Sequence, residues 1–222
     1  MSPILPHITL DTAQSPLHSI IWLHGLGADG NDFVPIAEEI NLPVAVRYIF
    51  PHAPEQAVTI NGGYIMRSWY DIVATDIGSK QDAIGVRASQ AEIEKLIAQE
   101  RARGIEAKNI FLAGFSQGGA IALHTGLRHQ EQLGGILALS SYLPLAETLA
   151  TEASDACTKT PIFMAHGRDD TIVPYALGKL SEAALQKQNY AIDWHEYDMP
   201  HSVCAKEVRD IEAWLTQRLE GD

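Results

Sequence analysis

The chain has 222 residues, 46% of them apolar, with 16 Lys and Arg against 28 Asp and Glu and a formal net charge of -12. Such an acidic chain repels the phosphates of nucleic acids and anionic lipid headgroups, so we expect no nucleic-acid partner and no stable membrane association. No run approaches about 18 uninterrupted apolar residues and the N-terminus has no secretion signal, so we expect a cytoplasmic protein.

Short apolar runs that end in Gly, Pro or His alternate along the chain with longer segments of helical periodicity. We predict strands at 19–24, 44–50, 109–114, 136–141, 161–166 and 191–197. Several of these runs are almost continuously apolar, which is typical of strands buried on both faces of a parallel sheet. The alternation predicts an α/β fold in one domain, residues 1–222, with a mostly parallel, doubly wound sheet covered by helices on both faces.

The clearest predicted helix covers 82–103, where Asp82 caps the first turn and Gly104 ends the last. Further helices are expected over 202–219 and from Pro174 onward, the latter with Leu177, Leu180 and Ala184 on its buried face. Residues 51–80 show no clear period. Segments of that length inside a compact domain usually serve a function or contain short strands.

The sequence Gly114-Phe-Ser116-Gln-Gly118 lies between a predicted buried strand and a predicted helix. A tight turn there holds the serine oxygen clear of the backbone, and glycines on either side leave room for the turn. The helix N-terminus at Ser116 also favours developing negative charge. The context favours a nucleophilic serine over a glycine-rich turn with a capping serine.

A serine hydroxyl needs a base that is oriented by an acid, and serine hydrolases built on such a sheet have them in the order Ser, acid, His. His195 and His201 both follow a suitable acid. His195 lies inside a predicted strand, whereas His201 lies in a loop before the last predicted helix, so we predict His201 as the base. Asp169 and Asp170 both follow the intervening strand, and the spacing leaves the choice between them open.

Acyl transfer also needs two backbone N–H groups that bind the oxyanion. Gln117 follows the nucleophile and supplies the first. The second is expected from the glycine-rich loop 24–27, directly after the first apolar strand.

Five segments, taken together and in this order, resemble the phospholipase/carboxylesterase family of α/β-hydrolases, which includes bacterial carboxylesterases and acyl-protein thioesterases. They are His24-Gly-Leu-Gly-Ala-Asp-Gly-Asn-Asp-Phe33, Met66-Arg-Ser-Trp69-Tyr-Asp71, Gly114-Phe-Ser-Gln-Gly-Gly119, His166-Gly-Arg-Asp-Asp-Thr-Ile-Val-Pro174 and Met199-Pro-His201-Ser. The resemblance extends from about residue 20 to residue 219. It implies an α/β-hydrolase fold without a cap domain.

The resemblance implies a catalytic triad of Ser116, Asp170 and His201, in which the acid stands four positions before the proline of its turn. It also implies that the amides of Leu26 and Gln117 form the oxyanion hole.

Residues 51–80 are similar to a short insertion that flanks the acyl site in the family. We expect Met66, Trp69 and Val173 to line the substrate pocket, with packing as the alternative role for Met66 and Trp69. Thr171 stands where thioesterase members commonly have Pro, which favours a carboxylesterase.

The expected activity is therefore hydrolysis of small to medium acyl esters through an acyl-enzyme, with no metal and no cofactor. The alternatives are an acyl-protein thioesterase or lysophospholipase, an acyltransferase that uses an alcohol or peroxide as acceptor, and a non-catalytic binding protein of the same fold. A homodimer is compatible with the family resemblance.

Overall fold

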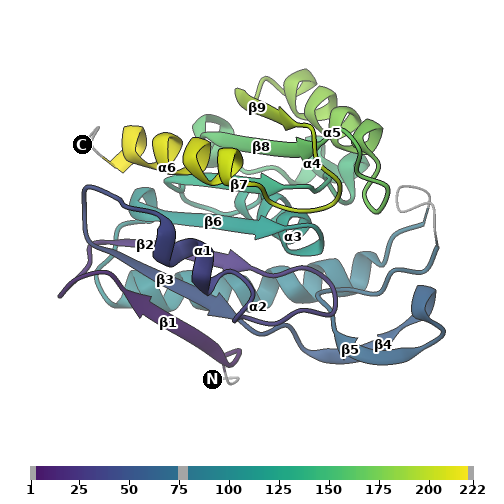
Figure 1. Ribbon diagram of the computed structural model, residues 1–222, viewed down its shortest axis with the longest axis horizontal. Coiled ribbons are helices and arrows are strands. Elements are labelled where there is room, and N and C mark those ends of the chain that lie inside the picture. The colour runs from purple at the N-terminus through teal and green to yellow at the C-terminus, as the bar shows by residue number, and fades with distance from the viewer. Residues whose placement is uncertain (1–3, 75–79, 220–222) are drawn as a thin grey trace.

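The computed structural model describes residues 4–74 and 80–219. A seven-stranded sheet with strand order β1-β3-β2-β6-β7-β8-β9 runs through its centre (Figure 1). The strands are β1 (His7–Asp11), β2 (His18–Leu23), β3 (Val46–Pro51), β6 (Ile110–Phe115), β7 (Gly135–Leu139), β8 (Ile162–Gly167) and β9 (Ile192–Tyr197). β1 pairs antiparallel with β3, and the other neighbours are parallel.

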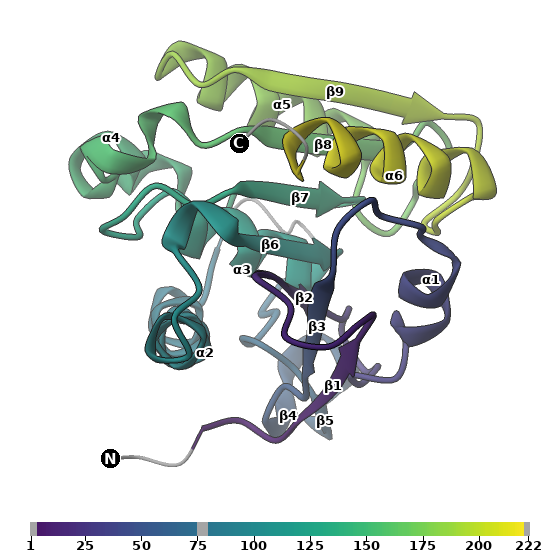
Figure 2. The same ribbon diagram turned by 90° about the vertical axis from the view of Figure 1, so that its left-hand side faces the viewer.

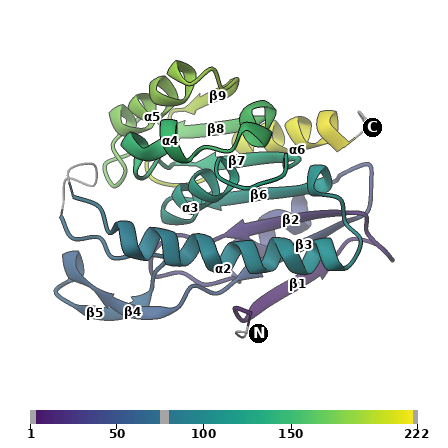
Figure 3. The ribbon, with the colours of Figure 1, turned by 180° about the vertical axis from the view of Figure 1, so that it is seen from behind.

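Helices cover both faces of this sheet, as Figures 2 and 3 show. Residues of α2 (Ala83–Ala102), α3 (Gln117–Gly126), α4 (Leu149–Glu152) and α5 (Tyr175–Lys187) belong to one apolar core, and residues of α6 (Ala205–Leu219) and of the segment around α1 (Val34–Glu39) belong to a second. β2 shows why both faces are apolar, because Ile21 and Leu23 enter the first core while Ile20 and Trp22 enter the second. No helix in the described part of the chain is both long and apolar enough to cross a bilayer.

The predicted strands are confirmed, each within two residues at either end. The helix expected at 82–103 is confirmed as α2, whose cap Asp82 accepts a hydrogen bond from the Gly85 amide at 2.9 Å. Gly104 follows with φ +95°, a left-handed conformation that suits glycine.

Two details of the predicted helices are wrong. Leu180 is 67% exposed, because α5 buries Gly178, Ser181 and Leu185 instead and thereby turns Leu180 outward. α6 begins at Ala205 rather than at residue 202, because residues 201–204 belong to the loop that carries His201.

The segment 51–80 contains a separate two-stranded antiparallel hairpin, formed by β4 (Glu55–Val58) and β5 (Tyr64–Arg67). The connection passes through the 3-10 turn η1 (Thr59–Asn61) and two glycines, Gly62 and Gly63, whose φ angles of +66° and +80° favour glycine. Figures 1 and 3 place this hairpin at the end of the molecule where the parallel strands end. It therefore lies at the edge where a doubly wound sheet has its binding crevice.

Glu207 makes the stability of this fold depend on pH. The side chain is 0% exposed in the first turn of α6, and neither carboxyl oxygen has a hydrogen-bond partner among the described residues. Burial raises the pKa of Glu207 from 4.5 to about 8, so the folded protein retains a proton that the unfolded chain releases. Stability from this group should fall by about 1.4 kcal/mol per pH unit as the pH rises from about 4.5 to 8.

Glu207→Gln should remove this dependence, so that the variant gains stability relative to the parent protein between pH 5 and pH 9. Urea unfolding across that range measures the difference. Glu38→Gln, on the exposed side of α1, is the control and should leave the slope unchanged. Parallel curves for Glu207→Gln and the parent protein would show that Glu207 is ionised in the folded state.

Candidate active site

Ser116 occupies a strained turn between β6 and α3. Its backbone has φ 54° and ψ -119°, a combination that residues with a side chain rarely adopt. The Ser116 amide donates to the Leu139 carbonyl at 2.8 Å, and the Ser141 hydroxyl donates to the Ser116 carbonyl at 2.7 Å. The neighbouring strand and loop thus hold the turn on both sides.

The glycines around Ser116 are required by close approaches of the backbone. A Cβ atom at Gly114 would lie 2.4 Å from the carbonyl carbon of Gly118, and one at Gly118 would lie 2.4 Å from the Leu23 carbonyl oxygen. A Cβ atom at Gly119 would lie 2.7 Å from that of Ser141. Any larger residue would force the turn open and move the serine.

Asp170 and His201 meet at the ends of β8 and β9. The imidazole Nδ1 of His201 lies 2.7 Å from Oδ2 of Asp170, while Oδ1 accepts hydrogen bonds from the amides of Ile172 and Val173, both at 2.9 Å. Burial acts to raise the pKa of Asp170, but the bond from His201 and the two amides outweigh it and hold the pKa below its ordinary value. The carboxylate is therefore ionised, which places the imidazole proton on Nδ1 and leaves Nε2 free to accept a proton.

The imidazole also lies close to the Ser116 turn. Its ring centroid is 4.7 Å from that of Phe115, the residue directly before Ser116. The alternative candidates make other contacts: His195 stacks on Phe163 at 4.5 Å and bonds Asp193, and Asp169 is exposed. The geometry thus brings together one aspartate, one histidine and the strained serine turn.

The loop after β2 passes beside the same turn. A Cβ atom at Gly25 would lie 3.6 Å from that of Ser116 and 3.3 Å from the Phe115 ring. The amides of Leu26 and Gln117 donate no hydrogen bond to any other residue of the described chain. Both N–H groups are therefore available to a substrate oxygen.

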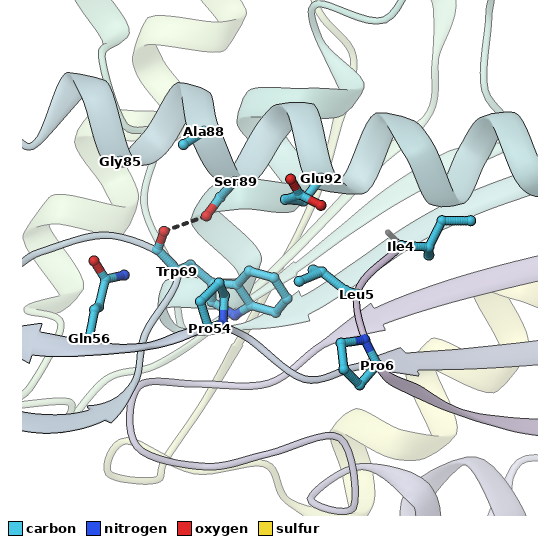
Figure 4. Close-up of a pocket in the computed structure, with 10 residues that line it drawn as sticks. All are labelled: Ile4, Leu5, Pro6, Pro54, Gln56, Trp69, Gly85, Ala88, Ser89 and Glu92. Atoms are coloured by element: carbon cyan, nitrogen blue, oxygen red, sulfur yellow. Dashed lines mark hydrogen bonds between the residues drawn. The ribbon is translucent and has the colours of Figure 1, made fainter. Parts of the chain in front are cut away.

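The three expected pocket residues differ in their surroundings. Met66 is half-buried and lines a hollow beside the loop after β2, together with Gly27 and Arg67. Val173 is 2% exposed and belongs to the turn that holds Asp170. Trp69 is also 2% exposed, and Figure 4 shows its indole beside a cavity of about 570 Å³ that residues of α2 and the N-terminal segment line.

Sequence reasoning missed three buried side chains near Ser116. Those of Ser68 and Gln117 bond each other, and Gln117 also accepts from the Trp69 amide, while the imidazole of His24 accepts from the Ala53 amide. Each lies in one of the segments that resemble the family, within two positions of a residue with a predicted role. Only this closeness in sequence could have indicated that these three side chains contribute to the site.

Comparison with known proteins gives consistent results. A family model described as Phospholipase/Carboxylesterase matches residues 9–219. The chain is 35% identical to an acyl-protein thioesterase 1 from Yarrowia lipolytica, over 98% of this chain and 99% of that protein. It is 34% identical to the carboxylesterase SOBER1 from Arabidopsis thaliana, over 91% of each. The crystal structure of SOBER1 superposes with a TM-score of 0.87 at 33% identity, over 91% of this chain and 99% of that one.

Proposed function

The chain belongs to the phospholipase/carboxylesterase family of α/β-hydrolases, and we propose that it is a serine carboxylesterase that hydrolyses small to medium acyl esters through an acyl-enzyme on Ser116. The observation that carries the proposal is the 2.7 Å contact between His201 and an ionised Asp170 beside a strained serine turn. Strain and a depressed carboxyl pKa are features that proteins maintain at functional sites.

In the acylation half, Ser116 Oγ forms a bond to the ester carbonyl carbon while His201 Nε2 takes the hydroxyl proton. The negative charge on the carbonyl oxygen is stabilised by the amides of Leu26 and Gln117, and Asp170 stabilises the imidazolium. The bond to the leaving oxygen then breaks, and His201 gives the proton to the departing alcohol.

In the deacylation half, water replaces the alcohol. His201 removes a proton from water, the resulting oxygen bonds to the acyl carbon, and the bond to Ser116 Oγ breaks. The proton returns to Ser116, so the products are a carboxylic acid and the free enzyme.

Covalent labelling tests this proposal directly. A fluorophosphonate should phosphonylate Ser116 at one adduct per chain, since the reagent requires an activated serine and an oxyanion site. Peptide mass spectrometry locates the adduct, and Ser116→Ala should remain unlabelled. Complete lack of reaction would favour a non-catalytic binding protein of this fold.

Thioester hydrolysis is the second candidate, because several relatives are named acyl-protein thioesterase 1. The same steps apply with a thiolate as the leaving group. kcat/KM for an ester and a thioester with the same acyl chain, measured over increasing chain lengths, separates the two activities. Each methylene that fits an apolar site adds at most about 0.8 kcal/mol, so the series also gives the length of the acyl site.

A further inference from the structure

The two proposed oxyanion donors belong to different parts of the fold. Leu26 lies in the loop after β2, whereas Gln117 is the first residue of α3. An oxyanion hole works only when both N–H groups are fixed about 3 Å from one oxygen position. The loop and the start of α3 pack directly against each other, since a Cβ atom at Gly118 would lie 2.4 Å from the Leu23 carbonyl oxygen. Any further element that bonds both sides would add to the precision with which the two donors are held.

Residues 67–70, here called the strap, contact the loop on both sides of Leu26. The indole Nε1 of Trp69 donates to the His24 carbonyl at 2.9 Å, and the Gly27 amide donates to the Arg67 carbonyl at 2.9 Å. The strap thus holds the backbone two positions before and one position after the donor.

The same strap contacts α3 through the side chain of Gln117. Its Oε1 accepts from the Trp69 amide at 2.8 Å, and its Nε2 donates to the Tyr70 carbonyl at 2.7 Å and to the Ser68 hydroxyl at 3.1 Å. Ser68, Trp69 and Gln117 are all at most 2% exposed. Water therefore does not compete for these bonds. Breaking one of them would leave a buried polar group without a hydrogen bond, which costs free energy.

The strap is itself fixed to the surrounding structure. Ser89 of α2 donates to the Trp69 carbonyl, as Figure 4 shows, and the hydroxyls of Tyr70 and Tyr142 bond at 2.6 Å. Burial lowers the pKa of His24 to about 4, so its imidazole is neutral. That neutral ring accepts from the Ala53 amide through Nε2 at 3.0 Å, which leaves Nδ1 to donate to the Gly25 carbonyl.

We infer that the strap positions the two halves of the oxyanion hole, with the Trp69 indole N–H and the Gln117 side-chain amide as positioning groups. This inference rests on the proposed function. Trp69 acts through the loop and Gln117 through its own helix end, so neither side chain needs to touch the substrate. Loss of either group should therefore weaken the stabilisation of negative charge that develops on the substrate oxygen in the transition state, and not the ground-state binding of the substrate.

Trp69→Phe keeps most of the ring and removes only the indole donor. Gln117→Met keeps the backbone amide and the side-chain length and removes the bonds to the strap. For each, kcat per titrated serine should fall about 10- to 50-fold while KM changes less than about threefold, because a shift of about 1 Å at a reacting site can cost 10²-fold. Trp214→Phe is the matched control, since that indole is also buried but its Nε1 has no partner among the described residues.

The readout that separates positioning from folding is the affinity for a trifluoromethyl ketone, which forms an oxyanion adduct with the serine. Its affinity should fall in proportion to kcat/KM in both variants, whereas the pH midpoint of kcat/KM should stay unchanged, because among the described residues no hydrogen bond or ion pair joins the strap to Asp170 or His201. Fluorophosphonate titration, carried to completion because labelling of the variants should be slower, counts the folded sites, so a variant that partly unfolds is still measured per active serine.

Unchanged turnover per titrated serine in both variants, or a loss confined to KM, would overturn the inference. A parent protein that fluorophosphonate does not label would instead overturn the proposed function, so the two failures are distinguishable.

Discussion

Replacing Ser116 by alanine should lower kcat for an acyl ester by about a millionfold while the protein remains folded, as removal of a triad nucleophile does in other serine hydrolases. The loss is large because the hydroxyl supplies the only covalent path, and His201 and Asp170 cannot act on an absent nucleophile. Stability should change little, since the Ser116 hydroxyl bonds no other described residue and alanine has the same Cβ in the strained turn. Steady-state turnover of a p-nitrophenyl ester and the thermal midpoint measure the two quantities.

The chain offers a matched control in Ser15, an exposed serine whose φ of 52° is close to that of Ser116. Ser15→Ala makes the same chemical change at a residue that also has a positive φ, and it should leave kcat unaltered. If Ser116→Ala retained more than about one hundredth of the parental turnover, another residue would have to be the nucleophile.

The central strands could be predicted because their burial on both faces gives continuous apolar runs, as in β2. β1 could not, because none of its five residues is fully buried and it therefore carries no such run. α1 has six residues, too few for a helical period to appear. The hairpin of β4 and β5 has mostly exposed or half-buried side chains and therefore shows neither pattern.

The sequence alone could predict those parts of the candidate site that depend on residue type and on order along the chain. Ser116 and His201 followed from the turn motif and the chain order. The choice between Asp169 and Asp170 did not, because spacing alone does not give the direction of a side chain. The bond between Trp69 and Gln117 joins residues 48 positions apart through a backbone amide, which every residue type except proline has, so no sequence pattern marks it.

Asp170→Asn should lower kcat by about 10⁴, the loss found when the triad aspartate of a serine protease of another fold is replaced in the same way. The environment of Asp170 sets which way the new amide points. The amides of Ile172 and Val173 both donate to Oδ1, so the asparagine oxygen stays there and its NH₂ takes the place of Oδ2. An NH₂ group only donates, and it would therefore face His201 Nδ1 as a donor.

The imidazole can satisfy that donor only by giving up the proton on Nδ1 and carrying it on Nε2 instead. In this tautomer Nε2 cannot accept the Ser116 proton, so the base is lost although all three residues remain in place. Asp169→Asn is the control, because the Asp169 carboxylate is exposed and makes no hydrogen bond or ion pair with a described residue. Its kcat should match that of the parent protein. A large loss in Asp169→Asn together with near-parental turnover in Asp170→Asn would assign the acid to the other aspartate.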